Sequence, residues 1–109
     1  MRDQPRPFFV KRRSADGQAV LEVGGECDAA TLDELNKALG ELVSQNPAEA
    51  VVDLAEVTFL DSLTLASLMA AASRVRAGGG SFGVVGVRAD VRRVFEITGL
   101  DRYLLVGGG

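Results

Sequence analysis

The chain has 109 residues, an apolar fraction of 47% and a formal net charge of −3, which predicts one domain with a hydrophobic core. The small acidic charge gives no reason to expect direct binding of nucleic acid, and no apolar run is long enough for membrane insertion. The chain has no histidine and one cysteine, Cys27, which excludes an intramolecular disulfide, a Ser-His-Asp triad and most zinc sites. We therefore expect a cytoplasmic protein that is not an enzyme, with no catalytic residues, metal or cofactor.

The N-terminal part of the chain predicts an antiparallel hairpin. Strands are expected over residues 8–13 and 19–23, on either side of Asp16-Gly17, because Asp-Gly is a strong hairpin signal. Residues 1–7 are expected to be a flexible tail, and residues 24–28 a loop that leaves the hairpin.

Two helices with a buried strand between them are predicted next. The first helix spans residues 31–44 and begins with a capping box, Thr31 to Glu34. The apolar run Val51 to Leu54 is typical of a strand buried on both faces, and residues 55–58 are expected to form a short link. Apolar residues then recur at helical spacing over residues 62–76.

The C-terminal part predicts one more strand and one more helix. The strand covers residues 81–87, and a helix follows that Asp90 caps and Gly99 ends. Residues 103–106 can form a short final strand, and residues 107–109 are expected to be a flexible tail.

Together these elements predict an α/β fold in the order β-β-α-β-α-β-α. Right-handed crossovers make the sheet mixed and mostly parallel, with four to five strands and three to four packed helices. The whole chain, 1–109, is expected to be a single domain with a core at about 8–106.

The strand-to-helix turn at Asp61-Ser62 is the first candidate site. It lies beside the carboxyl end of a core strand, where open α/β sheets place functional groups. If Asp61 is the N-cap, Ser62 is the first helical residue and its hydroxyl can face solvent. A phosphate there would meet the positive end of the helix dipole. Spacing alone favours the simpler interpretation that these residues only cap a helix.

Asp28 is the second candidate. It lies just outside the helix at residues 31–44. Its loop and the loop at Ser62 leave the sheet in directions that the same topological rules determine. It is then either an acidic contact on the same surface as Ser62 or one more loop carboxylate. The local sequence favours the loop carboxylate.

Four short motifs occur in order along the chain: Gly25-Glu26-Cys27-Asp28, Val51-Val52-Asp53-Leu54, Phe59-Leu60-Asp61-Ser62 and Val94-Phe95-Glu96-Ile97-Thr98-Gly99-Leu100. Together they resemble the STAS domain family, and in particular its stand-alone bacterial anti-sigma factor antagonists. The resemblance extends over about residues 8–106.

The resemblance implies a partner switch that regulates sigma-factor-dependent transcription. An unphosphorylated antagonist of this kind binds an anti-sigma factor, which is also a serine kinase with a histidine-kinase-like ATP-binding fold. Phosphorylation of the antagonist ends the complex, and a phosphatase restores it. The family pattern places the phosphorylated serine at Ser62 and the partner-binding surface at Asp28, Asp61, Ser62, Leu63 and Thr64. We expect a monomer or a weak dimer.

The motif departs from the family pattern directly after the serine. The family usually has Ser or Thr and then Gly, whereas this chain has Leu63 and Thr64. Thr64 is in principle a second phosphate acceptor. The departure favours an alternative without a serine switch, in which the domain is an accessory subunit of a lipid-transport ABC system or of another signalling assembly. An enzyme that uses Asp53 and Asp61 as paired carboxylates is disfavoured, since Asp53 falls inside a predicted strand.

Overall fold

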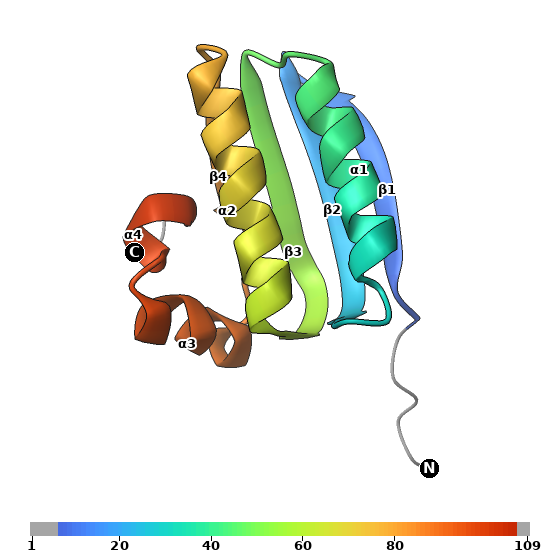
Figure 1. The fold of residues 1–109 in the computed structure, drawn as a ribbon, viewed down its shortest axis with the longest axis vertical. Coiled ribbons are helices and arrows are strands. Elements are labelled where there is room, and N and C mark those ends of the chain that lie inside the picture. The colour runs from blue at the N-terminus through green and yellow to red at the C-terminus, as the bar shows by residue number, and fades with distance from the viewer. Residues whose placement is uncertain (1–6, 107–109) are drawn as a thin grey trace.

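The structure is a computed structural model and describes residues 7–106. The described residues form four strands and four helices around one core (Figure 1). In chain order the elements are β1 (Phe9–Ala15), β2 (Gln18–Cys27), α1 (Leu32–Ser44), β3 (Glu49–Leu60), α2 (Ser62–Ala77), β4 (Ser81–Val85), α3 (Ala89–Thr98) and α4 (Asp101–Leu104). The flexible ends predicted for residues 1–7 and 107–109 lie outside the described residues, except for Pro7, which is exposed.

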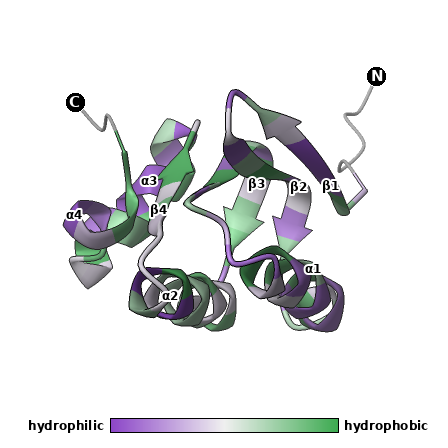
Figure 2. Ribbon diagram, turned by 90° about the horizontal axis from the view of Figure 1, so that it is seen from above, coloured by the Kyte–Doolittle hydropathy of each residue, from purple (hydrophilic) through white to green (hydrophobic). Residues whose placement is uncertain are grey.

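The sheet has the predicted topology. Its strand order is β1-β2-β3-β4, with β1 antiparallel to β2 and the other pairs parallel. Helices α1 and α2 lie side by side on one face of the sheet, and α3 and α4 lie on the β4 side (Figure 2). Every second residue of β3 is buried under the helices from Ala50 to Leu54, and after that two register shifts against β2 space the buried residues by three. The buried residues of β3 are Ala50, Val52, Leu54, Val57 and Leu60.

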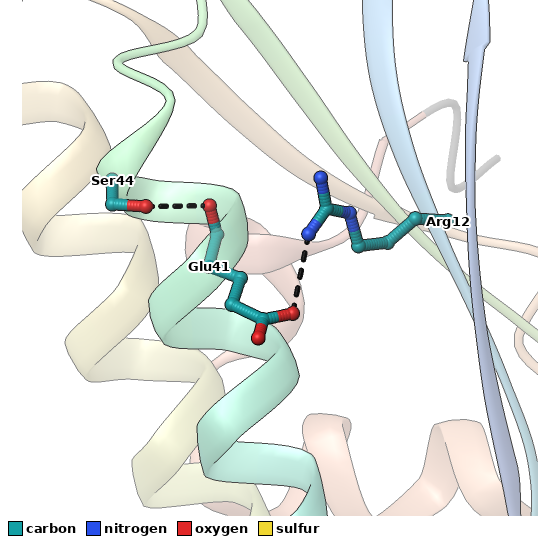
Figure 3. Close-up of polar contacts among 3 residues, drawn as sticks. All are labelled: Arg12, Glu41 and Ser44. Atoms are coloured by element: carbon teal, nitrogen blue, oxygen red, sulfur yellow. Dashed lines mark hydrogen bonds and ion pairs between the residues drawn. The ribbon is translucent and has the colours of Figure 1, made fainter.

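The basic residues of β1 lie on an edge strand, as expected for a strand that avoids pairing with another chain. Arg12 donates from Nη1 to the Glu41 carboxylate of α1 at 3.2 Å, and Ser44 Oγ donates to the Glu41 carbonyl oxygen at 2.9 Å (Figure 3). Both charged side chains of this ion pair are exposed, so it contributes at most about 1 kcal/mol.

Strands β2 and β3 are longer than the sequence predicts. The predicted loop at residues 24–28 and the predicted link at residues 55–58 are wrong, because these segments pair with each other in parallel. The pairing of β2 with β3 shifts register before Gly24 and again after Gly25, and at each shift β3 has one residue more than β2. A Cβ on Gly24 would lie 2.0 Å from the Phe9 ring, and Gly25 has a φ of +86°, so both positions require glycine inside a strand.

Four further predictions are wrong, two at helix starts and two in strands. Thr31 occupies the N-cap position of α1 but makes no side-chain cap, and Arg88, not Asp90, is the N-cap of α3. The predicted strand at residues 103–106 is instead the helical turn α4 followed by a single bridge from Leu105 to Val84, and β4 already ends at Val85. Gly99 ends α3 in the left-handed conformation, as predicted.

The segment after α3 is held by α2. Arg76 Nη2 donates to the carbonyl oxygens of Phe82 at 3.0 Å and Tyr103 at 2.8 Å, and its guanidinium lies 4.4 Å from the centre of the Tyr103 ring. This long-range anchor favours the compact turn over an extended strand. Within residues 7–106, no helix has the length and apolar character needed to cross a lipid bilayer.

Candidate functional site

The two candidate loops leave the sheet at the same edge. Because β2 and β3 are parallel neighbours, their last residues, Cys27 and Leu60, are paired in register. Asp28 and Asp61 therefore follow directly at adjacent strand ends. This juxtaposition is the one that the predicted topology implied, and it assembles the site from segments more than thirty residues apart in the chain.

Asp61 caps α2 and leaves Ser62 free to face solvent. Asp61 has extended backbone angles, φ −100° and ψ 178°, and its Oδ1 accepts a hydrogen bond from the Thr64 amide at 2.9 Å. Ser62 is the first residue of α2 and is exposed. The amides of the first helical turn have no acceptor within the helix, so a negative group on the Ser62 hydroxyl would be stabilised there.

Thr64 does not lie on the surface. Its side chain is only 2% exposed, and its Oγ1 donates to the carbonyl oxygen of Cys27 at 3.2 Å. The same carbonyl oxygen accepts from the Asp61 amide at 3.1 Å. The structure therefore places the Thr64 hydroxyl in an internal hydrogen bond, which disfavours both a partner contact by this side chain and its use as a phosphate acceptor.

The Asp28 loop is closed by local hydrogen bonds. Asp28 Oδ1 accepts from the Ala30 amide at 3.0 Å, and the Asp28 amide donates to Thr31 Oγ1 at 3.0 Å. The Thr31 hydroxyl in turn lies within 3.2 Å of the Glu26 and Asp28 carbonyl oxygens, which explains why it does not cap α1. Asp28 is half-buried, so its carboxylate is held at the surface in a defined loop.

Two large apolar side chains flank the Asp61-Ser62 turn in an exposed position. Phe59 is 49% exposed and Leu63 is 51% exposed. Leu63 was a predicted contact, whereas Phe59 was not among the candidates predicted from the sequence. The available signal was the alternation in β3, since the burial of Leu60 turns Phe59 toward the opposite face. Exposed apolar side chains of this size at a polar turn are typical of a protein-binding surface.

Carboxylates gather around the Asp28 loop. The loop and the first turn of α1 contribute Glu26, Asp28, Asp33 and Glu34, whereas α3, which carries Arg92 and Arg93, lies at the same end of the molecule beside the start of α2 (Figure 1). Burial, followed by the charges of Asp28 and Asp61, raises the pKa of the Cys27 thiol to about 11. Cys27 is 1% exposed, so it is a packed and protonated thiol, as predicted.

A cavity of about 300 Å³ lies away from the Asp28 and Asp61-Ser62 loops. Its lining includes Gln18, Glu49 and Ser81, the first residues of β2, β3 and β4. These residues are at the opposite ends of the strands from Cys27 and Leu60. The candidate site is thus a surface formed by two loops and a helix start, which suits a macromolecular partner better than an enclosed small molecule.

The family model described as "Mlab, STAS domain" matches residues 10–107. The chain belongs to the STAS domain family. This STAS domain is 41% identical over 98 residues to the anti-sigma-F factor antagonist RsfB of Mycobacterium tuberculosis, covering 90% of this chain and 80% of RsfB. The family assignment made from the four motifs is therefore confirmed.

Solved structures agree with the sequence relatives. The crystal structure of an anti-sigma factor antagonist from Mycobacterium paratuberculosis is 35% identical to this STAS domain, with a TM-score of 0.82, and the match covers 90% of this chain and 83% of that chain. The anti-sigma factor antagonist SpoIIAA in its unphosphorylated form has the same fold, with a TM-score of 0.70 at 18% identity, covering 91% and 86% of the two chains. The predicted single-domain α/β fold with a four-stranded mixed sheet is confirmed.

Proposed function

We propose that this STAS domain is an anti-sigma factor antagonist of the cytoplasm. Unphosphorylated, it binds an anti-sigma factor that is also a serine kinase; phosphorylation of Ser62 ends the complex and a phosphatase restores it. The observation that carries the proposal is that Asp61 caps α2, so that the side chain of the adjacent Ser62 is not needed as the cap and is exposed. The names of the curated relatives support the role.

The partner-binding surface that we propose consists of Asp28, Asp61, Ser62, Leu63 and Phe59. The two apolar side chains supply area that a partner can bury, and the carboxylates favour a partner with a basic rim. Domain boundaries of 1–109 and a monomeric or weakly dimeric state belong to the same proposal.

Phosphorylation is an effective switch at this position for an electrostatic reason. A phosphate adds about −1.5 to −2 charges to a turn where Asp61 is the adjacent residue and Asp28 follows the neighbouring strand. In the free protein the start of α2 and water stabilise that charge, whereas in a complex it would be desolvated beside Asp28 and Asp61. A difference of about 3 kcal/mol corresponds to a loss of affinity of more than 100-fold.

The test is a pull-down from native lysate with Ser62→Ala and Ser62→Asp baits, read by mass spectrometry. We expect an anti-sigma factor with a kinase fold on the Ser62→Ala bait and its loss on the Ser62→Asp bait. Ser14→Asp is the matched control, because Ser14 is exposed and pairs with Ala19 near the other end of the sheet. Its bait should retain the partner.

The alternative is an accessory subunit of a lipid-transport ABC system or of another assembly without a serine switch. The observation that favours it is Leu63, which replaces the second hydroxyl of the family motif. Equal recovery of a permease or an ATPase by the Ser62→Ala and Ser62→Asp baits would replace the antagonist proposal with this one.

A further inference from the structure

Thr64 is the one buried polar side chain among residues 7–106. Both of its polar groups are paired: the amide donates to Asp61 Oδ1 at 2.9 Å, and the hydroxyl donates to the Cys27 carbonyl oxygen at 3.2 Å. A buried hydroxyl without a partner would be costly, so this hydrogen bond is required wherever Thr occupies the position. The residue therefore has a defined place in the architecture of the turn.

The Cys27 carbonyl oxygen is the point where the two candidate loops meet. It accepts from the Thr64 hydroxyl and from the Asp61 amide, both at the start of α2, and it belongs to the residue directly before Asp28. The two donors come from a segment more than thirty residues away in the chain. We call this pair of hydrogen bonds the Cys27 brace.

We propose that Thr64 is the positioning residue of the switch: through the Cys27 brace it fixes the start of α2, and with it Ser62, to the Asp28 loop, so that a partner meets both as one rigid surface. The inference rests on the proposed function. It also assigns Ser62 as the phosphate acceptor in preference to Thr64, since the Thr64 hydroxyl is committed to the brace.

The brace has a specific consequence once Ser62 is phosphorylated. The new negative charge lies next to the Asp61 carboxylate and repels it, which weakens the cap that Asp61 provides to the Thr64 amide. The acceptor of the brace is a neutral main-chain oxygen, so the brace does not depend on that carboxylate. The start of α2 then keeps its place, and the phosphate ends binding through charge and desolvation without unwinding the helix.

The first part of the test uses the isolated full chain. In ¹⁵N-labelled Thr64→Val, which keeps the branched shape and removes the hydroxyl, we expect the amide of Asp61 to exchange its hydrogen about fivefold faster, the equivalent of one lost hydrogen bond. Thr64→Ser, which keeps the hydroxyl, should restore slow exchange. The amide of Val84, a fully buried residue of β4, is the internal control and should not change. The variant should fold, because the Cys27 carbonyl keeps its second donor; Thr64→Ala replaces Thr64→Val if it does not.

The second part uses the kinase recovered with the Ser62→Ala bait, purified and supplied with ATP. We expect kcat/KM for phosphorylation of Ser62 to fall about fivefold in Thr64→Val and to recover within twofold in Thr64→Ser, with phosphate on Ser62 alone in the wild type. Equal exchange rates in the Val and Ser variants, equal phosphorylation of both, or phosphate on Thr64 would each overturn the proposal.

The exchange measurement needs no partner, so it separates the failure of this inference from that of the proposed function. A bait experiment that recovers no anti-sigma factor refutes the partner switch. Unchanged exchange at Asp61 refutes the brace, whatever the baits recover.

Discussion

Asp61→Ala is expected to lower the free energy of unfolding by about 1–2 kcal/mol. The carboxylate makes one cap hydrogen bond, to the Thr64 amide at 2.9 Å, and loss of an N-cap acceptor typically costs about 1 kcal/mol. Removing a negative charge from the first turn of α2 adds about 0.3–1 kcal/mol. Asp61→Asn keeps an oxygen acceptor and loses only the charge, so it should cost no more than about 1 kcal/mol.

Urea unfolding followed by far-UV circular dichroism is the suitable assay, because the chain has no tryptophan and a single tyrosine. For a domain of this size each kcal/mol corresponds to a shift in Tm of about 4 °C. The two variants also separate capping from recognition: if the charge of Asp61 contacts the partner, both should weaken binding alike while their stabilities differ. Wild-type stability in Asp61→Ala would refute the capping argument.

Two further predictions concern pH and glycine. Above the ordinary thiol pKa of 9.0 the unfolded Cys27 ionises, while burial keeps the folded thiol protonated to about 11. The unfolded state then binds fewer protons than the folded state, so the free energy of unfolding should fall as the pH rises between these two values. Urea titrations at pH 8, 9 and 10 would measure this fall, which should be smaller in Cys27→Ala. Gly40→Ala should stabilise the protein by about 0.5–1 kcal/mol, because a Cβ inside α1 meets no atom within 4 Å. Gly80→Ala should instead destabilise it, since its Cβ would lie 2.3 Å from the Pro47 carbonyl oxygen, and thermal melts of the pair should move in opposite directions.

Features that depend on neighbouring residues could be predicted from the sequence. The Asp61 cap and the exposed Ser62 follow from residues within one helical turn, and the Asp-Gly hairpin follows from two residues. The shared edge for Asp28 and Asp61 follows from topology alone, because parallel strands end on the same side of a sheet.

Features that depend on residues distant in the chain could not be predicted from the sequence. Gly24 and Gly25 resemble a loop until Phe9 and β3 are placed against them. The burial of Thr64 depends on a carbonyl oxygen 37 residues away, and a residue directly after an exposed turn gives no local sign of it. The helical turn α4 similarly depends on Arg76, from a different helix.

The acceptor in the Cys27 brace is a main-chain oxygen, whereas one of its donors is a side chain. Substitution should therefore be tolerated at position 27 more readily than at position 64. Any residue at position 27 presents the same carbonyl, so a small apolar side chain can replace the cysteine without loss of the hydrogen bonds. Position 64 has no such freedom, because only Ser or Thr brings a hydroxyl to that oxygen from this point of the helix. Positions 27 and 64 should therefore show no covariation, even though a hydrogen bond connects them. A relative with glycine at position 64, as in the usual family motif, would lack this hydroxyl and keep only the hydrogen bond of the Asp61 amide, so we expect its turn to be more mobile.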